Sequence, residues 1–456
     1  MLYLLDRINH IVWGVPALFL ILGLGLYFTI RTGFLQIRML PRALKRFLNQ
    51  FRLRNHSDGQ ISSYKAVCTA LAATVGTGNL AGVAGGIALG GPGAVFWMWI
   101  CAILGMILKF AEVSLAVYYR HKNENDEWEG GPMYMIRNGL SPKWKWLAGI
   151  YCFFGVVAAF GVGNTTQINT VIYSINGVLR TYHVDASTMR NIMIGTILAV
   201  IMTILLLGGA KRIGQVAECL VPFASISYLF LGIGVLIVCH DSLPGALQKI
   251  ITGAFRPQAV TGGVVGSTMI CLRTGAARGV FTNEAGMGTA SIAHAGANVA
   301  HPFEQGLMGI IEVFLDTIVI CTMTALVILC SGVKIPYGID IGVQLTIDAF
   351  SKIYGNWVGI FIAVALCVFA CATILGWGLY GGRCAQYLFG EKSWKSFAIM
   401  QGVFIVVGAT LNMGVVWKIS EILNGCMAIP NLIALGMLSP VLFRLLNEYK
   451  KSGTRL

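Results

Sequence analysis

The amino-acid sequence predicts an all-α polytopic membrane protein with eleven transmembrane helices, organised as one N-terminal helix plus a 5+5 inverted repeat. The chain has 456 residues, of which 56% are hydrophobic and only 11% are charged. Its mean hydropathy is +0.74, whereas soluble domains carry about 25% charged residues. No stretch alternates apolar and polar residues with a period of two, which excludes a β-barrel. The sequence therefore predicts a bundle of helices that faces lipid.

The predicted spans follow from length, because a helix needs about 20 apolar residues to cross about 30 Å of hydrocarbon. Eleven segments meet this rule: 14–30, 66–90, 93–119, 146–179, 191–209, 214–239, 259–292, 305–332, 355–386, 397–413 and 419–443. No polar or low-complexity linker separates them, so we expect residues 1–456 to form a single transmembrane domain.

The repeat is predicted from the number and character of these spans. Without the extra helix at 14–30, ten spans remain and divide into 66–239 and 259–443. An odd number of helices in each half inverts the second half relative to the first. The leading span of each half is interrupted by glycine and polar residues, which is typical of secondary transporters. The helices that follow them also match weakly, with Glu112 late in one and Glu312 and Asp316 late in the other.

The distribution of basic residues predicts the orientation. With the N-terminus outside, 22 Lys and Arg residues fall in cytoplasmic segments and eight in external ones. This bias favours an N-out, C-in arrangement in the cell membrane. It also accounts for the net charge of +14 without a nucleic-acid partner. The basic stretch 35–54 is predicted to be an amphipathic helix on the inner leaflet, with a solvated loop as the alternative.

Cysteine and histidine residues give no sign of a metal centre. Most of the twelve Cys residues lie inside apolar segments and none forms a CxxC motif, and the seven His residues show no metal-ligand spacing. We therefore expect the cysteines to be small packing residues in a reducing environment.

The first predicted break runs from Thr74 to Gly82, within the sequence VGTGNLAGVAGG. Unpaired backbone at membrane depth is tolerated only where it lines a cavity or binds something. Exposed amides at a half-helix N-terminus favour a carboxylate, and carbonyls at a C-terminus favour a cation. A break therefore offers both poles that an amino acid and a sodium ion require. Close packing of small residues is the alternative for Gly82 and Gly86.

The second predicted break runs from Gly279 to Gly286 and includes Glu284. An intramembrane carboxylate costs about 2.5–3.5 kcal/mol on insertion scales and should have a partner, for which Arg278 or Arg273 is the natural candidate. An ion pair that braces the loop and a direct ligand contact both remain open. Phe281 is a candidate wall for a small side chain.

Two further helices carry candidate polar and aromatic residues. Asn164 and Gln167 share one face of a helix, and we choose Gln167 as a substrate contact, although intramembrane amides often bond neighbouring helices. Trp377 lies well inside its span, between Gly376 and Gly378, where its ring can cap a small pocket. Thr373 precedes it by one turn, and its hydroxyl suits a sodium ion. Back-bonding of Thr373 to its own helix is the alternative.

Three stretches carry a family resemblance. VGTGNLAGVAGGIALGGPGAVFWMWICAILGM, TGAARGVFTNEAGMGTASIAHA and ILGWGLYGG resemble the alanine or glycine:cation symporter family, also called sodium:alanine symporters. The likeness covers nearly the whole chain. It implies the amino acid–polyamine–cation superfamily and a LeuT-type inverted repeat, with discontinuous core helices one and six at 66–90 and 259–292.

The resemblance also implies site residues. Substrate contacts would come from both breaks and from two other helices: Thr77, Gly78, Asn79, Gln167, Phe281, Thr282, Asn283 and Trp377. A sodium ion would be held by the carbonyls of Ala72 and Val75 and by Thr373. The wider fold often has a second hydroxyl residue beside this threonine, where this chain has Ile374.

We therefore expect a secondary active transporter that carries a small neutral amino acid, alanine or glycine first, into the cell with sodium by alternating access. Its partners would be the amino acid, the co-transported Na⁺ and the lipid bilayer, with no nucleic acid and no obligate protein partner. Proton coupling and a passive small-solute channel are the alternatives. A membrane enzyme would need acid–base groups such as Glu112 and Glu284, but HExxH, GxSxG and Cys–His signatures are absent, so we do not expect an enzyme.

Overall fold

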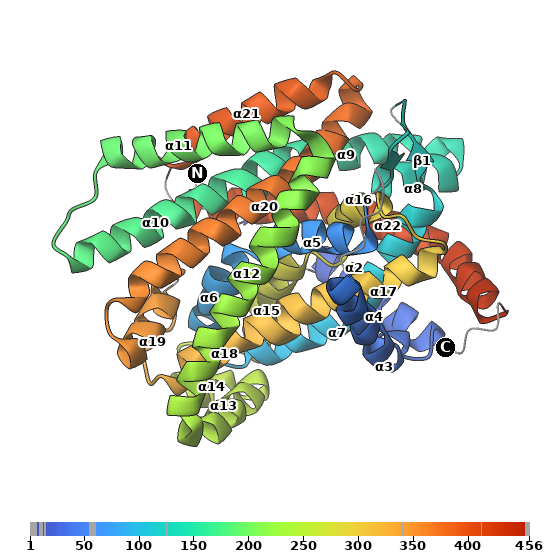
Figure 1. The fold of residues 1–456 in the computed structure, drawn as a ribbon. Helices are drawn as coiled ribbons and strands as arrows, with labels where there is room; N and C mark the ends of the chain where they lie inside the picture. The colour runs from blue at the N-terminus through green and yellow to red at the C-terminus, as the bar shows by residue number, and fades with distance from the viewer. Residues whose placement is uncertain are drawn as a thin grey trace.

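The computed structural model describes residues 7–8, 12, 15–53, 61–124, 126–339, 341–411 and 413–451, and these are mostly helical (Figure 1). The sheet within these ranges is one antiparallel hairpin, in which β1 (His121–Lys122) pairs with β2 (Trp128–Glu129). The predicted helical fold is confirmed. Gly14 of the first expected span and Arg54 of the expected amphipathic segment lie outside the described residues.

Helices in the first half of the chain follow one another with short connections. They are α2 (Val15–Arg31), α3 (Leu35–Arg38), α4 (Leu40–Leu53), α5 (Ser63–Thr74), η1 (Gly78–Gly82), α6 (Val83–Gly90), α7 (Ala94–Tyr118), α8 (Pro132–Gly139), η2 (Pro142–Trp144), α9 (Lys145–Phe160), η3 (Gly161–Thr165), α10 (Thr166–Thr181), α11 (Thr188–Leu207) and α12 (Gly209–Val238). The π-helical segment η1 leads into α6, and the π-helical segment η3 lies between α9 and α10.

The second half has the same character. Its helices are η4 (His240–Ser242), α13 (Leu243–Phe255), α14 (Pro257–Thr261), α15 (Thr268–Asn283), α16 (Thr289–Ala295), α17 (Pro302–Val313), η5 (Phe314–Cys321), α18 (Thr322–Cys330), α19 (Gln344–Tyr354), α20 (Val358–Phe389), α21 (Ser393–Gly408) and α22 (Met413–Lys451). A third π-helical segment, η5, lies between α17 and α18.

Several of these helices can cross a bilayer. Seven helical stretches in the described residues are long and apolar enough, and an eighth is a pair bent by 48°, Ser63–Thr74 with Gly78–Gly90. Shorter apolar helices cover 17–31 and 393–408. A multi-pass membrane protein is thus confirmed, while the count of eleven spans stays a prediction.

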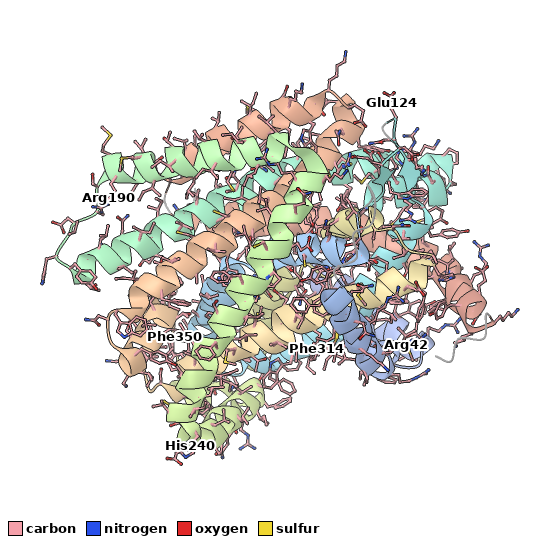
Figure 2. The ribbon with its side chains drawn as sticks, viewed as in Figure 1. Arg42, Glu124, Arg190, His240, Phe314 and Phe350 are labelled. Carbon is pink, nitrogen blue, oxygen red and sulfur yellow. The ribbon has the colours of Figure 1, made fainter. Side chains whose placement is uncertain are left out.

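The surface of α12 shows how the bundle meets lipid. Phe223, Ile226, Phe230, Ile233 and Ile237 are all exposed and recur at the three- and four-residue spacing of one helix face. In water such a stripe would be strongly unfavourable, whereas lipid tails accept it. Charged residues such as Arg190 and His240 lie at the periphery of the bundle (Figure 2).

The boundaries differ from prediction around the seventh span. It was expected to begin at residue 259, but α15 begins at Thr268, where Ser267 accepts a hydrogen bond from the amide of Ile270 at 3.2 Å. Gly262 and Gly263, with φ of 65° and 88°, end α14 just before it. Residues 243–261, expected to lie mostly in a loop, form α13 and α14 instead, with proline in the first turn of each.

Candidate functional site

The first break separates α5 from η1 and α6 near the middle of the bundle. Helix α5 ends at Thr74, and Val75 adopts an extended conformation. The amide of Gly76 donates to Oδ1 of Asn79 at 2.8 Å, and the amide of Asn79 donates to the carbonyl of Gly76 at 3.3 Å. In a continuous helix these two amides would bond the carbonyls of Ala72 and Val75. The break therefore redirects the usual donors of both carbonyls that were predicted to bind sodium.

The hydroxyl of Thr373 faces this break from α20. Its Oγ1 is buried and has no hydrogen-bond partner in the described structure, so back-bonding to its own helix is not observed. A Cβ placed on Gly76 would lie 2.4 Å from this oxygen. Oγ1 of Thr373 is therefore a buried oxygen that receives no hydrogen bond, and the carbonyls of Ala72 and Val75 lack their usual helical donors. Oxygens of this kind fit a hard cation such as sodium.

Side chains from three helices also meet at the first break. Thr77 donates from its hydroxyl to Oε1 of Gln167 at 2.8 Å, which joins η1 to α10. A Cβ on Gly78 would lie 3.3 Å from Cγ2 of Thr282 and 3.5 Å from the ring of Phe281. The structure thus brings the first break, Gln167 and the end of α15 into contact, as predicted for a shared pocket.

The second break lies a few residues later than predicted. Helix α15 continues through Asn283, and the chain is non-helical only from Glu284 to Gly288, before α16. Glu284 has a φ of 53°, and Gly286 and Gly288 have φ values of 90° and 77°. Those two glycines permit the turn. Gly279 instead allows close packing on α7, because its Cβ would lie 3.4 Å from Cα of Met98.

Glu284 does not pair with Arg278, which contradicts that prediction. Arg278 forms an ion pair with Glu421 at 3.1 Å. The carboxylate of Glu284 accepts hydrogen bonds from Nε1 of Trp377 at 2.7 Å and from Oγ1 of Thr289 at 2.5 Å, and its backbone carbonyl accepts one from Nζ of Lys109 at 3.1 Å. Glu284 ends α15 in a left-handed conformation, and its side chain contacts Trp377 on α20. Arg273, the other candidate, lies on α15.

Asp316 is a functional candidate that the sequence analysis did not select. It is fully buried on η5. Asn79 donates to its Oδ1 at 2.6 Å, and Thr317 donates to its Oδ2 at 2.8 Å. Thr317 in turn accepts from Nδ2 of Asn283 at 3.1 Å. One carboxylate therefore links the polar side chains of both breaks. Its position late in the helix had been noted, but its depth and the π-helical turn have no sequence signal.

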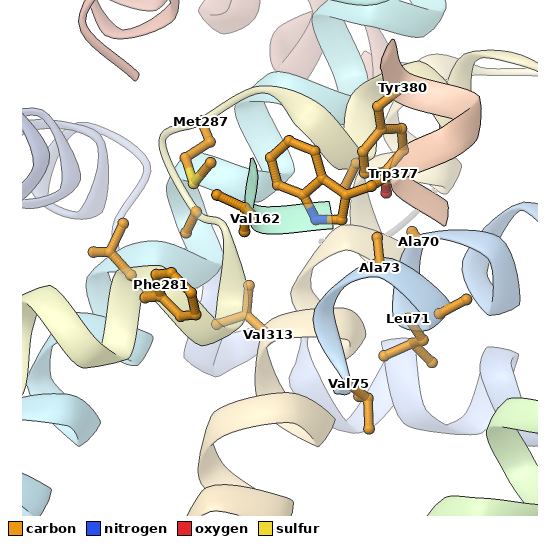
Figure 3. Packing of buried hydrophobic residues seen from close by; sticks show 14 of the residues in the cluster. Ala70, Leu71, Ala73, Val75, Val162, Phe281, Met287, Val313, Trp377 and Tyr380 are labelled. Atoms are coloured by element: carbon orange, nitrogen blue, oxygen red, sulfur yellow. The ribbon is translucent and has the colours of Figure 1, made fainter. Parts of the chain in front are cut away.

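Trp377 and Asn164 lie near this site but face other partners. Trp377 is fully buried against Gly163, where a Cβ would come within 2.2 Å of Cβ of Trp377. Figure 3 shows its indole beside Val162 and Ala73, with Phe281 lying apart from it. The ring of Phe281 stacks on Trp417 at 5.0 Å. Asn164 donates to the backbone and side-chain oxygens of Gln401 at 2.7 Å and 2.5 Å, so it joins η3 to α21.

Comparison with known proteins identifies relatives of this chain and a similar fold. The chain is 40% identical to a protein of Methanococcus maripaludis named sodium/alanine symporter AgcS, over 99% of this chain and 98% of the relative. It is 41% identical to an uncharacterized transporter of Haemophilus influenzae, over 98% and 95% of the two chains. Its fold resembles the crystal structure of MhsT in complex with L-phenylalanine, with a TM-score of 0.58, 15% identity and coverage of 84% and 90%.

A sequence profile described as the sodium:alanine symporter family matches residues 2–455. The profile therefore spans both breaks and the helices that carry Gln167, Asp316 and Thr373. Together with relatives that align along almost their whole length, this match shows that the chain belongs to the sodium:alanine symporter family.

Proposed function

We propose that this protein carries a small neutral amino acid, alanine or glycine first, into the cell together with sodium by alternating access. The observation that carries the proposal is the meeting of two interrupted helices in a buried polar site. Thr77 and Asn79 come from one break, Thr282 and Asn283 precede the other, and Asp316 links them. A soluble amino acid needs such a polar site to cross the apolar interior.

The residues have separate roles in this proposal. Thr77, Gly78 and Gln167 contact the amino acid, while Phe281 and Thr282 border the space for its side chain. Asn79 and Asn283 position the ends of the two breaks, and Trp377 closes the site from α20. Sodium binds to the carbonyls of Ala72 and Val75 and to Oγ1 of Thr373. The buried charge of Asp316 favours the cationic load, which is sodium and the ammonium group of the substrate.

Sodium coupling supplies enough free energy for uphill transport. An amino acid zwitterion carries no net charge, so each sodium ion moves one charge, which contributes about 2.3 kcal/mol at about 100 mV. A tenfold sodium gradient adds about 1.4 kcal/mol. One ion per substrate would then sustain an accumulation on the order of several hundredfold.

The finer architecture belongs to the same proposal. Residues 66–239 and 259–443 form two inverted five-helix repeats of the LeuT type in one domain of eleven spans, with residues 14–30 as an extra helix. The N-terminus lies outside and the C-terminus lies in the cytoplasm of the cell. The similarity of the fold to MhsT and the excess of basic residues in the expected cytoplasmic segments support this arrangement.

Uptake of labelled alanine into proteoliposomes tests the function. We expect accumulation above equilibrium with an inward sodium gradient and none when potassium replaces sodium. Accumulation driven by a proton gradient without sodium would assign a proton symporter. Equilibration without accumulation under any gradient would assign a passive channel, and either result would overturn sodium symport.

A further inference from the structure

A second polar cluster lies beside the second break and has no role in the transport site proposed above. It comprises Lys109 and Glu112 on α7, Glu284 in the break, His294 on α16 and Glu312 on α17, and each of these side chains is at most 2% exposed. Helix α7 packs directly against α15, α16 and α17. The cluster therefore sits where the parts of the second break meet the rest of the bundle.

The hydrogen bonds indicate that His294 is neutral. Ser63 donates to Oε1 of Gln305 at 2.6 Å, so the amide nitrogen of Gln305 is the donor to Nδ1 of His294 at 2.7 Å. Nδ1 is then an acceptor, and the ring hydrogen resides on Nε2, which donates to Oε2 of Glu312 at 3.2 Å. The histidine therefore orients Glu312 without adding a positive charge.

The cluster consequently contains more acidic groups than its cation can balance. Lys109 lies 3.4 Å from Oε1 of Glu312, and its other contact is the backbone carbonyl of Glu284. Among the described residues, Lys109–Glu312 is the ion pair of these three glutamates, because the contact of the neutral His294 with Glu312 is a hydrogen bond. Glu112 and Glu284 remain without a paired cation, and buried unpaired charge is strongly unfavourable.

Glu112 and Glu284 differ in their hydrogen bonds. Both oxygens of Glu284 accept hydrogen bonds, from Trp377 and Thr289, which suits an ionised carboxylate. Glu112 receives both its donors on Oε1, from the amide of Gly288 at 3.1 Å and from Nδ2 of Asn431 at 2.8 Å. Its Oε2 is buried and has no hydrogen-bond partner in the described structure. An ionised Glu112 would leave a bare anionic oxygen in the protein interior.

Two buried hydroxyls near Glu112 also have no hydrogen-bond partner in the described residues. They belong to Tyr151 on α9 and Tyr380 on α20, and both lie within electrostatic range of Glu112 and Glu284.

No group of three or more acidic, histidine or cysteine side chains in the described chain converges closely enough to hold a metal ion. A proton, which needs one oxygen, therefore balances the charge where a metal ion does not fit.

We propose that Glu112 is a proton-binding site: it holds a proton on Oε2 in this conformation and releases it when the second break moves away. The carboxyl group is tied directly to the second break, because Oε1 accepts from the amide of Gly288 while Asn431 also donates to the carbonyl of Gly286 at 2.9 Å. Separation would admit water, which hydrates the ionised form. Acid therefore stabilises the conformation described here, and alkali favours opening of the second break. The movement itself rests on the proposed transport function.

Glu112→Gln tests the proposal, because glutamine keeps an acceptor oxygen and replaces the protonated oxygen with an amide group that does not ionise. The first measurement is the thermal midpoint of purified protein from about pH 6 to about pH 9. We expect the wild-type midpoint to fall as pH rises and the Glu112→Gln midpoint to change far less. Glu124→Gln, at an exposed loop position, should keep the wild-type profile. A wild-type profile that Glu112→Gln leaves unaltered would overturn the proposal.

A second variant keeps the test decisive if Glu112→Gln fails to fold. Asn431→Ala removes a donor that stabilises the ionised form of Glu112, so the transition in the thermal midpoint should move to higher pH; a shift to lower pH would overturn the proposal.

Alanine uptake across the same pH range separates the proton-site proposal from the proposed transport function. Absence of sodium-driven uptake by wild-type protein refutes the transport function, whereas the thermal profile judges Glu112 without substrate. With uptake intact, a profile as steep in Glu112→Gln as in wild type refutes the proton site alone.

Discussion

The indole nitrogen of Trp377 donates a 2.7 Å hydrogen bond to Oε1 of Glu284, from the middle of α20 to the first residue of the second break. Both side chains are buried. The same helix presents Thr373 to the first break one turn earlier. Helix α20 therefore contacts both interrupted helices, and a shift of either break must alter its contacts. Such a link can couple the proposed sodium site at Thr373 to the second break.

Trp377→Phe should lower thermal stability and slow uptake. Phenylalanine retains an aromatic ring but removes the donor, and the loss of a hydrogen bond to a buried charged group costs about 1.5–3 kcal/mol. We expect a lower melting temperature in detergent and reduced alanine uptake in proteoliposomes. Trp357→Phe is the matched control, because Trp357 is 56% exposed at the start of α20. Equal stability of the two variants would show that the hydrogen bond to Glu284 contributes little.

Thr373→Val should weaken sodium dependence more than it lowers the maximal rate. Valine has the shape of threonine without the hydroxyl, so it removes one proposed sodium ligand with little change in packing. A loss of about 1.4 kcal/mol would raise the half-activating sodium concentration about tenfold. Thr373→Ser should retain most of the affinity, and Thr196→Val at an exposed position of α11 should behave as wild type. A sodium activation curve unchanged in Thr373→Val would remove this residue from the ion site.

The sequence predicted the position of the first break, whereas it placed the start of the second break a few residues too early. Gly76 and Gly78 beside Thr77 and Asn79 are unfavourable in a lipid-facing helix, and the structure bends the chain there by 48°. The hydroxyl of Thr373, predicted as a sodium ligand, lies beside Gly76 in the first break, and its role in binding sodium stays a prediction. The prediction of the first break succeeded because it depends on the local cost of polar groups and glycine at membrane depth.

Partners of buried charges were not predictable in the same way. Arg278 and Glu284 are six positions apart, but the left-handed conformation of Glu284 turns the chain at that point. Glu284 then meets Trp377, which lies 93 residues away in the sequence. Asp316 likewise depends on an eight-residue π-helical segment that aims it at Asn79. Such pairings are set by tertiary packing and not by any local pattern.

Asp316→Asn should abolish most uptake while the protein still folds. The substitution removes the buried negative charge and places an amide where Thr317 donates, so the link from Asn79 to Asn283 is disrupted. We expect uptake to fall by about tenfold or more, which corresponds to a loss of about 1.4 kcal/mol. Thermal shifts measured separately with alanine and with sodium test whether each still binds. Asp348→Asn on α19 serves as the control, since Asp348 accepts a hydrogen bond from Gln344 on the same helix. Wild-type uptake by Asp316→Asn would show that its charge is dispensable.

Arg383→Gln should loosen the β1–β2 hairpin, which Arg383 ties to the end of α20. Arg383 lies near the end of α20 and forms ion pairs with Glu129 and, at 3.4 Å, with Glu127. Glu129 is buried and also accepts from Asn123 at 2.8 Å and from the hydroxyl of Tyr134 at 3.2 Å. Removing the guanidinium leaves this carboxylate without its cation, so the hairpin should open more often.

Hydrogen exchange measures that opening directly. Amides of residues 121–124 and 126–129 should exchange faster in Arg383→Gln than in wild-type protein, because their protection requires the closed hairpin. Lys395→Gln, at an exposed position of α21, should leave the exchange unchanged. Identical exchange in the two proteins would show that Arg383 does not hold the hairpin closed.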